Sequence, residues 1–172
     1  MPAPHASRQQ IEVYRFSVPA ALGLPLLALL LQAFLPLRLP VLSIFDLPLL
    51  VTIYFAVGRR NQITGMLTGG VIGLLQDSLT HQPIGLYGIA KTVIGYAASS
   101  LGVKLDVDNP GTRLLMTFGF YLLHQAVYFG VARGLAGEAL YWRWGHELIG
   151  GVANALLALV LFTVLDNFRQ RA

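Results

Sequence analysis

Apolar residues run along this chain in long stretches, which are separated by proline, glycine and charged residues. A helix that spans a bilayer needs about 20 mostly apolar residues, within a range of about 17–25. Six stretches approach that length, at residues 17–35, 42–57, 63–79, 84–101, 114–133 and 148–165. The pattern therefore predicts an all-α integral membrane protein, a bundle of six transmembrane helices joined by short loops.

The first two stretches differ from ordinary spans. The first, from Ser17, is longer than the about 7–15 residues of a signal-peptide core, and a proline and Arg38 follow it instead of a small-residue cleavage pattern. We expect it to be retained as the first helix. The second is short and contains Asp46 and Pro48, so we expect it to be tilted or to start in the interface.

Composition points to a single membrane domain over residues 1–172. Only 12% of residues are charged and 55% are hydrophobic, whereas soluble domains carry about 25% charged residues. The chain has no cysteine, which excludes disulfides and thiolate chemistry. Its net charge of +4 fits basic cytoplasmic loops, so we expect no nucleic-acid partner.

An even number of spans places both termini on one side of the membrane. The segments on that side hold eight basic residues: Arg8, Arg15, Arg59, Arg60, Lys104, Arg113, Arg169 and Arg171. The segments on the other side hold three, namely Arg38, Arg133 and Arg143. Because basic residues are enriched in cytoplasmic loops, both termini are predicted to be cytoplasmic.

Two charged residues lie inside the predicted spans, where each costs about 2.5–3.5 kcal/mol by insertion scales. Asp77 ends the third span, and Lys91 lies about 10 Å along the fourth at 1.5 Å per residue. We expect these two to pair across the hairpin, with Gln76 beside them. The pair either staples the two helices together or forms part of a pocket or partner site; a proton relay is a third possible use.

Glycines recur on the same two spans. Gly65, Gly69 and Gly73 follow one another at four-residue spacing, and Gly88 and Gly95 share a face with Lys91. Such spacing lets helix backbones approach closely. We expect the two glycine-lined faces to pack on each other, and docking of a partner helix is the alternative.

Polar residues on the last two spans form a further candidate site. Tyr121, His124 and Tyr128 lie on one side of the fifth span, and Asn154 lies in the sixth. They either line a cavity for a small molecule or join helices through hydrogen bonds. His124 has no second ligand at metal-binding spacing, and phosphate-loop, zinc-protease and serine-hydrolase motifs are absent, so we expect no metal, no cofactor and no enzyme activity.

Several motifs occur in a fixed order between residues 46 and 96. They are Asp46-Leu47-Pro48 with Tyr54, Gly73-Leu74-Leu75-Gln76-Asp77-Ser78, Pro83-Ile84-Gly85-Leu86-Tyr87, Lys91-Thr92 and Gly95-Tyr96. In these motifs the chain resembles the MreD family of bacterial rod-shape-determining proteins. Beyond this segment the likeness is one of hydropathy and topology.

The resemblance implies a non-catalytic scaffold or regulator of the elongation (rod) complex in the bacterial cytoplasmic membrane. Such a protein would bind the transmembrane helix and juxtamembrane region of MreC and support lateral peptidoglycan synthesis and cell shape. RodA, a class B penicillin-binding protein and MreB would be indirect partners, and membrane lipids direct ones. The family is also similar in architecture to the substrate-binding subunits of energy-coupling-factor transporters, which makes a small-molecule uptake subunit the alternative function.

Overall fold

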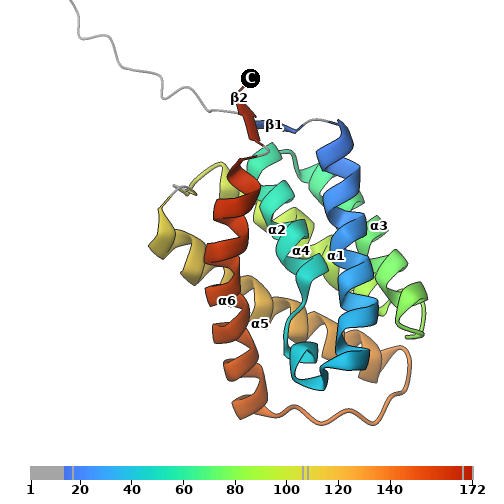
Figure 1. Ribbon diagram of the computed structural model, residues 1–172. Helices are drawn as coiled ribbons and strands as arrows, with labels where there is room; N and C mark the ends of the chain where they lie inside the picture. The colour runs from blue at the N-terminus through green and yellow to red at the C-terminus, as the bar shows by residue number, and fades with distance from the viewer. Residues whose placement is uncertain (1–13, 17, 106, 108, 168, 172) are drawn as a thin grey trace, which may run out of the picture.

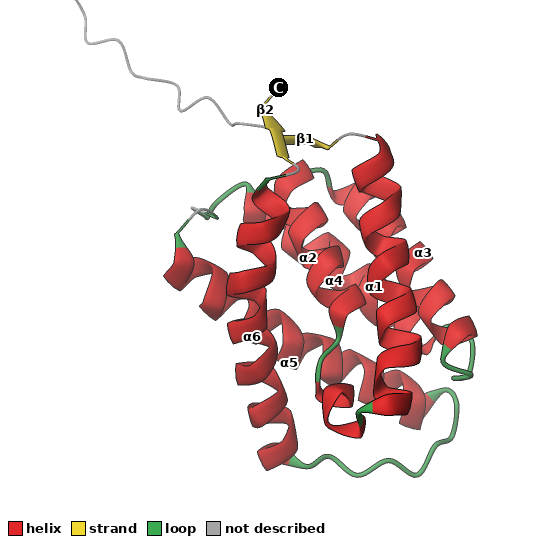
Figure 2. Cartoon of the chain, viewed as in Figure 1, coloured by secondary structure: helices red, strands yellow, loops and turns green. Residues whose placement is uncertain are grey.

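The computed structural model describes residues 14–16, 18–105, 107, 109–167 and 169–171. Within them lie six α-helices, one 3-10 helix and two three-residue strands (Figure 1, Figure 2). The helices are α1 (Val18–Arg38), η1 (Pro40–Ile44), α2 (Leu47–Arg59), α3 (Gln62–Leu79), α4 (Leu86–Gly102), α5 (Pro110–Gly134) and α6 (Trp144–Asp166). The predicted all-α membrane bundle of six helices is confirmed.

Among the described residues, four segments are both long and apolar enough to cross a membrane: Pro19–Arg38, Pro40–Arg59, Pro110–Gly134 and Trp144–Asp166. The helices α3 and α4 fall outside this set, with 18 and 17 residues. At 1.5 Å per residue they are about 27 and 26 Å long, slightly less than the about 30 Å of a bilayer core. These two glycine-containing helices form a hairpin against the rest of the bundle.

The two strands bring the ends of the chain together. β1 (Tyr14–Phe16) pairs antiparallel with β2 (Arg169–Arg171), with Tyr14 opposite Arg171. The hydropathy pattern did not predict this pairing. We call the end of the bundle that carries β1 and β2 the terminal face, and the end that carries the α5–α6 loop the opposite face (Figure 1).

The hairpin of α3 and α4 depends on glycine. A Cβ placed on Gly65, Gly69 or Gly73 of α3 would fall on a backbone carbonyl of α4. In α4, a Cβ on Gly95 would fall on the carbonyl of Gly65, whereas one on Gly88 would meet the Leu74 side chain at 2.9 Å. The glycine-lined faces of α3 and α4 therefore lie in close contact in the structure.

The second predicted helix, 42–57, is wrong at its start. Residues 40–44 form η1, and α2 begins only after Asp46, whose carboxylate accepts a hydrogen bond from Leu49 N at 2.9 Å. Pro48 in the first turn lacks an N–H, which suits a position where helical N–H groups have no partner. α2 is buried from Pro48 to Gly58 and lies at the centre of the bundle (Figure 1).

Candidate functional site

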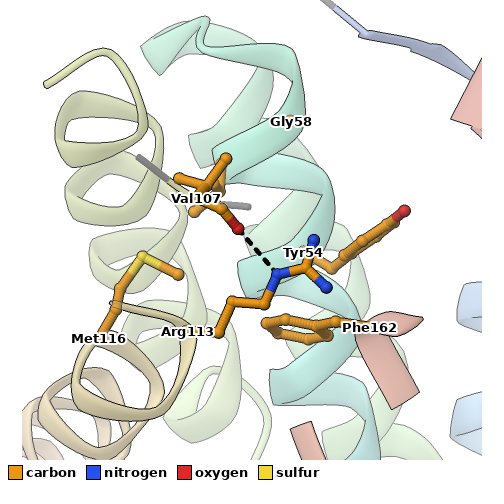
Figure 3. Close-up of a pocket in the computed structure, with 7 residues that line it drawn as sticks. Tyr54, Gly58, Val107, Arg113, Met116 and Phe162 are labelled. Carbon is orange, nitrogen blue, oxygen red and sulfur yellow. Dashed lines mark hydrogen bonds between the residues drawn. The ribbon is translucent and has the colours of Figure 1, made fainter. Parts of the chain in front are cut away.

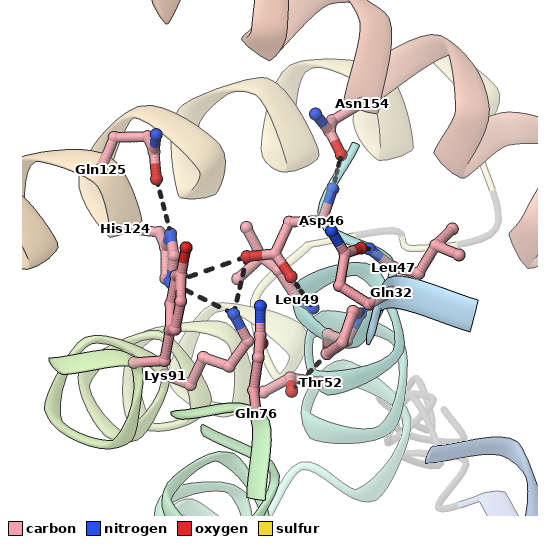
Figure 4. Close-up of polar contacts among 12 residues, drawn as sticks. Gln32, Asp46, Leu47, Leu49, Thr52, Gln76, Lys91, His124, Gln125 and Asn154 are labelled. Atoms are coloured by element: carbon pink, nitrogen blue, oxygen red, sulfur yellow. Dashed lines mark hydrogen bonds and ion pairs between the residues drawn. The ribbon is translucent and has the colours of Figure 1, made fainter. Parts of the chain in front are cut away.

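Each of the six helices contributes one polar side chain to the middle of the bundle (Figure 4). These six residues, the central polar cluster, are Gln32 of α1, Asp46 at the start of α2, Gln76 of α3, Lys91 of α4, His124 of α5 and Asn154 of α6. The last four are buried, and the Lys91, His124 and Asn154 side chains have no exposed surface. The sequence placed four of the six among its candidates, grouping Gln76 with Lys91 and His124 with Asn154, but it did not bring the two groups together.

Lys91 pairs with Asp46, not with Asp77 as predicted. The distance from Lys91 Nζ to Asp46 Oδ2 is 2.7 Å, and the two side chains are 0% and 13% exposed. Two charges removed from water in this way are tolerated only because they face each other and have further hydrogen-bonding partners. The prediction was wrong because it took the acid nearest in the hairpin, whereas Lys91 points across to the start of α2 (Figure 4).

Asp77 instead holds the turn between α3 and α4. Its buried carboxylate accepts hydrogen bonds from the backbone N–H groups of Gly85 at 2.8 Å, Tyr87 at 3.0 Å and Gly88 at 3.2 Å. The first N–H groups of a helix have no helical partner, and a negative charge there is favourable. Gly85 has φ +108, a value that suits glycine. The aspartate and glycine motifs of the sequence therefore build one helix cap.

Replacing Asp77 by alanine is expected to lower the free energy of unfolding by about 1–3 kcal/mol, because buried N–H groups of α4 lose their acceptor. Asp77→Asn should cost less, since one carbonyl oxygen remains to accept. Thermal unfolding of the purified protein in one detergent measures both. Ser78→Ala is the control, because the Ser78 hydroxyl bonds only Leu74 O of its own helix at 3.0 Å; a loss as large as that of Asp77→Ala would contradict the capping role.

His124 extends the ion pair toward the opposite face. Lys91 Nζ lies 3.2 Å from His124 Nε2, His124 Nδ1 lies 3.1 Å from Gln125 Oε1, and Gln125 Nε2 donates to Glu147 Oε2 at 3.0 Å. A protonated lysine can only donate, so His124 accepts at Nε2 and donates from Nδ1 as a neutral imidazole. One continuous chain of polar contacts thus joins Asp46 to Glu147 across α2, α4, α5 and α6.

Asn154 and Gln32 support the break between η1 and α2. Asp46 N donates to Asn154 Oδ1 at 2.9 Å, Asn154 Nδ2 donates to Ile44 O at 2.8 Å, and Leu47 N donates to Gln32 Oε1 at 3.0 Å. Within a bilayer, an unpaired backbone group costs several kcal/mol. The hydrogen bonds of these two side chains therefore replace the helical hydrogen bonds that are lost at the break.

The residues that were candidates for a cavity lining are packed against other side chains. The ring of Tyr87 stacks on His124 at 5.8 Å and on Tyr128 at 4.7 Å. Tyr121 is buried against Gly150 of α6, where a Cβ would collide with its ring. Of the two uses that the sequence left open, His124 and Asn154 serve the second, joining helices through hydrogen bonds.

A second ion pair closes the terminal face, where Arg113 Nη2 lies 2.8 Å from Asp166 Oδ2 and Arg113 Nε donates to Val107 O at 2.7 Å (Figure 3). Tyr54 also donates to Asp166, at 3.0 Å. The cavity beside these groups has a volume of about 20 Å³, which is room for about one water. These contacts are structural, because the space is too small for a substrate.

Sequence reasoning gave no role to Gln32, Gln125 or Glu147, and it used Asp46 only as a feature of a weak span and as part of a family motif. For Asp46 a signal was present, because an aspartate followed closely by proline is typical of a helix start. The other three are single polar residues within apolar helices and give no local signal. Within the described residues, no three histidine, aspartate or glutamate side chains come together as a metal site would require.

One comparison with known proteins gives a match. The family model described as "rod shape-determining protein MreD" matches residues 12–168, which is nearly the whole chain. No curated protein and no solved structure matches. The matched range includes α5 and α6, for which the sequence motifs offered no likeness beyond hydropathy.

Proposed function

Because the chain belongs to the MreD family, and so has a role in rod shape determination, we propose that it is a non-catalytic membrane scaffold of the bacterial elongation complex. In this role it binds MreC through the MreC transmembrane helix and juxtamembrane region. It thereby supports lateral peptidoglycan synthesis, with RodA, a class B penicillin-binding protein and MreB as indirect partners. The resemblance read from the sequence is confirmed at the level of the family.

The direction in which polar and apolar groups face supports binding within the bilayer. The ammonium of Lys91, the imidazole of His124 and the amide of Asn154 are buried and bonded to other parts of this chain. The groove that opens on the flank between α4 and α5 has no charged residue in its lining. Partner helices approach a membrane protein from its flanks, where small residues allow close contact.

The groove between α4 and α5 carries this proposal. It has a volume of about 510 Å³ and is lined by Leu101, Leu105, Thr112, Leu115, Met116, Gly119, Phe120 and Leu123. Gly119 lies within it, and a Cβ added there would meet nothing within 4 Å. At Gly65, Gly69 and Gly73 of α3, the missing side chain lets α4 approach closely. No described part of the chain approaches Gly119 in this way. An open glycine in an apolar groove lets a partner helix approach the α5 backbone, and we assign the MreC helix to this place.

The terminal face lies in the cytoplasm in this proposal. Of the basic residues with described side chains, Arg59, Arg60, Lys104 and Arg113 lie at the terminal face, and Arg38, Arg133 and Arg143 lie toward the opposite face. Arg8 lies outside the described residues, as do the side chains of Arg15, Arg169 and Arg171. The bias of the whole sequence toward one side supports this orientation.

The alternative function, a substrate-binding subunit of an energy-coupling-factor transporter, would need an open cavity around His124 and Asn154. Both side chains are fully buried, and their polar atoms are bonded within the protein. No observation in the described part of the chain favours that function. The similarity in architecture to those subunits stays a prediction.

Replacing Gly119 by phenylalanine should fill the α4–α5 groove and reduce the amount of MreC that co-purifies with the tagged protein by about ten-fold or more. Folding should be kept, because the added side chain enters open space and phenylalanine is a better helix former than glycine. Gly130→Phe is the matched control, since Gly130 lies on the same helix and is equally open. Equal recovery of MreC with both variants would contradict the assignment of this groove.

A further inference from the structure

A second flank groove lies between α1 and α3, with α2 as its floor, and we call it the α1–α3 groove. Its volume is about 370 Å³, and its lining residues are Ala21, Leu22, Pro25, Leu26, Phe55, Arg59, Leu67, Thr68, Val71, Ile72 and Leu75. Ten of these are apolar or threonine, and one, Arg59, is charged. This charge distinguishes it from the α4–α5 groove, whose lining has none.

The apolar part of the α1–α3 groove runs along α3 on the flank of the bundle. It follows α3 from Leu67 to Leu75, a rise of eight residues or about 12 Å at 1.5 Å per residue. Its rims are exposed, with Leu22, Leu67 and Val71 at 63%, 65% and 57%. Such a trough suits a flexible hydrocarbon chain that enters from the side.

The charged part of the groove lies at the terminal face. Arg59 ends α2, with its guanidinium 5.9 Å from the centre of the Phe55 ring. Arg60 follows in the left-handed conformation, and its buried Nε has no hydrogen-bond partner among the described residues. Neither arginine forms an ion pair with a described acidic residue. Arg59 therefore places a guanidinium group at the terminal-face end of an apolar groove, and the next residue, Arg60, has a buried Nε without a described partner.

We propose that the α1–α3 groove binds an anionic phospholipid. One acyl chain lies along the apolar walls formed by α1 and α3, and the phosphate accepts hydrogen bonds from Arg59 and Arg60. Guanidinium groups bind phosphate oxygens in a bidentate manner, and basic residues at the cytoplasmic interface attract anionic headgroups. A purely apolar partner helix in this groove would leave the arginines without a counter-charge. This site is separate from the α4–α5 groove and does not depend on MreC.

The test is native mass spectrometry of the full-length protein, delipidated and then titrated in mixed micelles with dioleoyl phosphatidylglycerol or dioleoyl phosphatidylcholine. The wild-type protein should retain phosphatidylglycerol preferentially. The double variant Arg59→Gln/Arg60→Gln should bind it about ten-fold more weakly or worse, with phosphatidylcholine unchanged. The control, Arg38→Gln/Arg143→Gln, removes two exposed arginines toward the opposite face and should leave the preference intact.

A second variant distinguishes lipid binding in the groove from electrostatic attraction of headgroups by the arginines alone. Val71→Trp fills the trough and keeps both arginines, and it too should lose retained phosphatidylglycerol. If binding is unchanged in Val71→Trp, or if the two arginine pairs behave alike, the proposed site is overturned. Loss of MreC from Val71→Trp with unchanged phosphatidylglycerol binding would instead make this groove a helix site and would also overturn it. Matching thermal unfolding midpoints show that the variants are folded.

Discussion

Replacement of Lys91 by methionine is expected to lower the free energy of unfolding by about 3–5 kcal/mol, the usual cost of leaving one member of a buried ion pair alone. Asp46 would then keep its negative charge at a side chain that is 13% exposed. Asp46 also supports the start of α2 through Leu49 N. The loss should therefore spread to the central helix, and it can be measured as the thermal unfolding midpoint in a fixed detergent.

The double variant Asp46→Asn/Lys91→Met should recover most of that loss. Asparagine keeps an oxygen that can accept from Leu49 N, and the pair of charges disappears together. Removing both members of a buried pair is often close to neutral, whereas removing one is strongly destabilising. A double variant no more stable than Lys91→Met would show that the ion pair is not the source of the effect.

The control for Lys91→Met is Lys104→Met, the same substitution at an exposed position between α4 and α5. Surface substitutions usually change the free energy of unfolding by no more than about 0.5 kcal/mol. Asp77→Asn should not reproduce the recovery when combined with Lys91→Met, because Asp77 bonds the backbone of α4. This comparison separates the observed partner of Lys91 from the partner that the sequence suggested.

The second large effect is expected for Gly69→Val. A Cβ at Gly69 would fall on the backbone carbonyl of Lys91 and lie 3.3 Å from a methyl group of Thr52. A backbone carbonyl cannot turn aside as a flexible side chain can, so α3 must move away from α4. Overpacking usually lowers the free energy of unfolding by about 1–3 kcal/mol. We expect a decrease of about 3 kcal/mol or more for Gly69→Val, because two helices are displaced.

Gly130→Val is the matched control for Gly69→Val, because a Cβ at Gly130 meets nothing within 4 Å. Both variants are made in one background and compared by their unfolding midpoints and by the fraction that elutes as a single species in size-exclusion chromatography. Similar behaviour of the two would mean that the hairpin tolerates separation. It would also contradict the view that the α3 glycines serve internal packing.

These contacts suggest how the bundle serves a scaffold. The ion pair, the His124 chain and the Asp77 cap join all but α1 through buried polar groups, and Gln32 joins α1 to the start of α2. Buried polar groups that bond to one another favour one arrangement of a packed interior over others. The two grooves on the flanks are then held in fixed shape for the helix and the lipid that we assign to them.

Much of this protein was determined by the sequence itself. Six helices follow from the lengths of the apolar stretches, since each stretch must satisfy its own backbone in lipid. The meeting of the glycine faces of α3 and α4 also follows from the sequence, because a short turn makes neighbouring helices antiparallel and four-residue spacing puts Gly65, Gly69 and Gly73 on one side. The family followed from motifs in the same region and is confirmed by the match over residues 12–168.

Only the tertiary structure decided which polar groups bond to one another. Asp46 and Lys91 are 45 residues apart, and Asp46 and Asn154 are 108 apart. Local spacing does not fix how each helix is rotated or how far it is shifted along its axis, and these two quantities select the partner of a buried side chain. The tertiary structure also decided that α2 starts at a supported break and that the α1–α3 and α4–α5 grooves differ in charge, because both features result from the packing of helices.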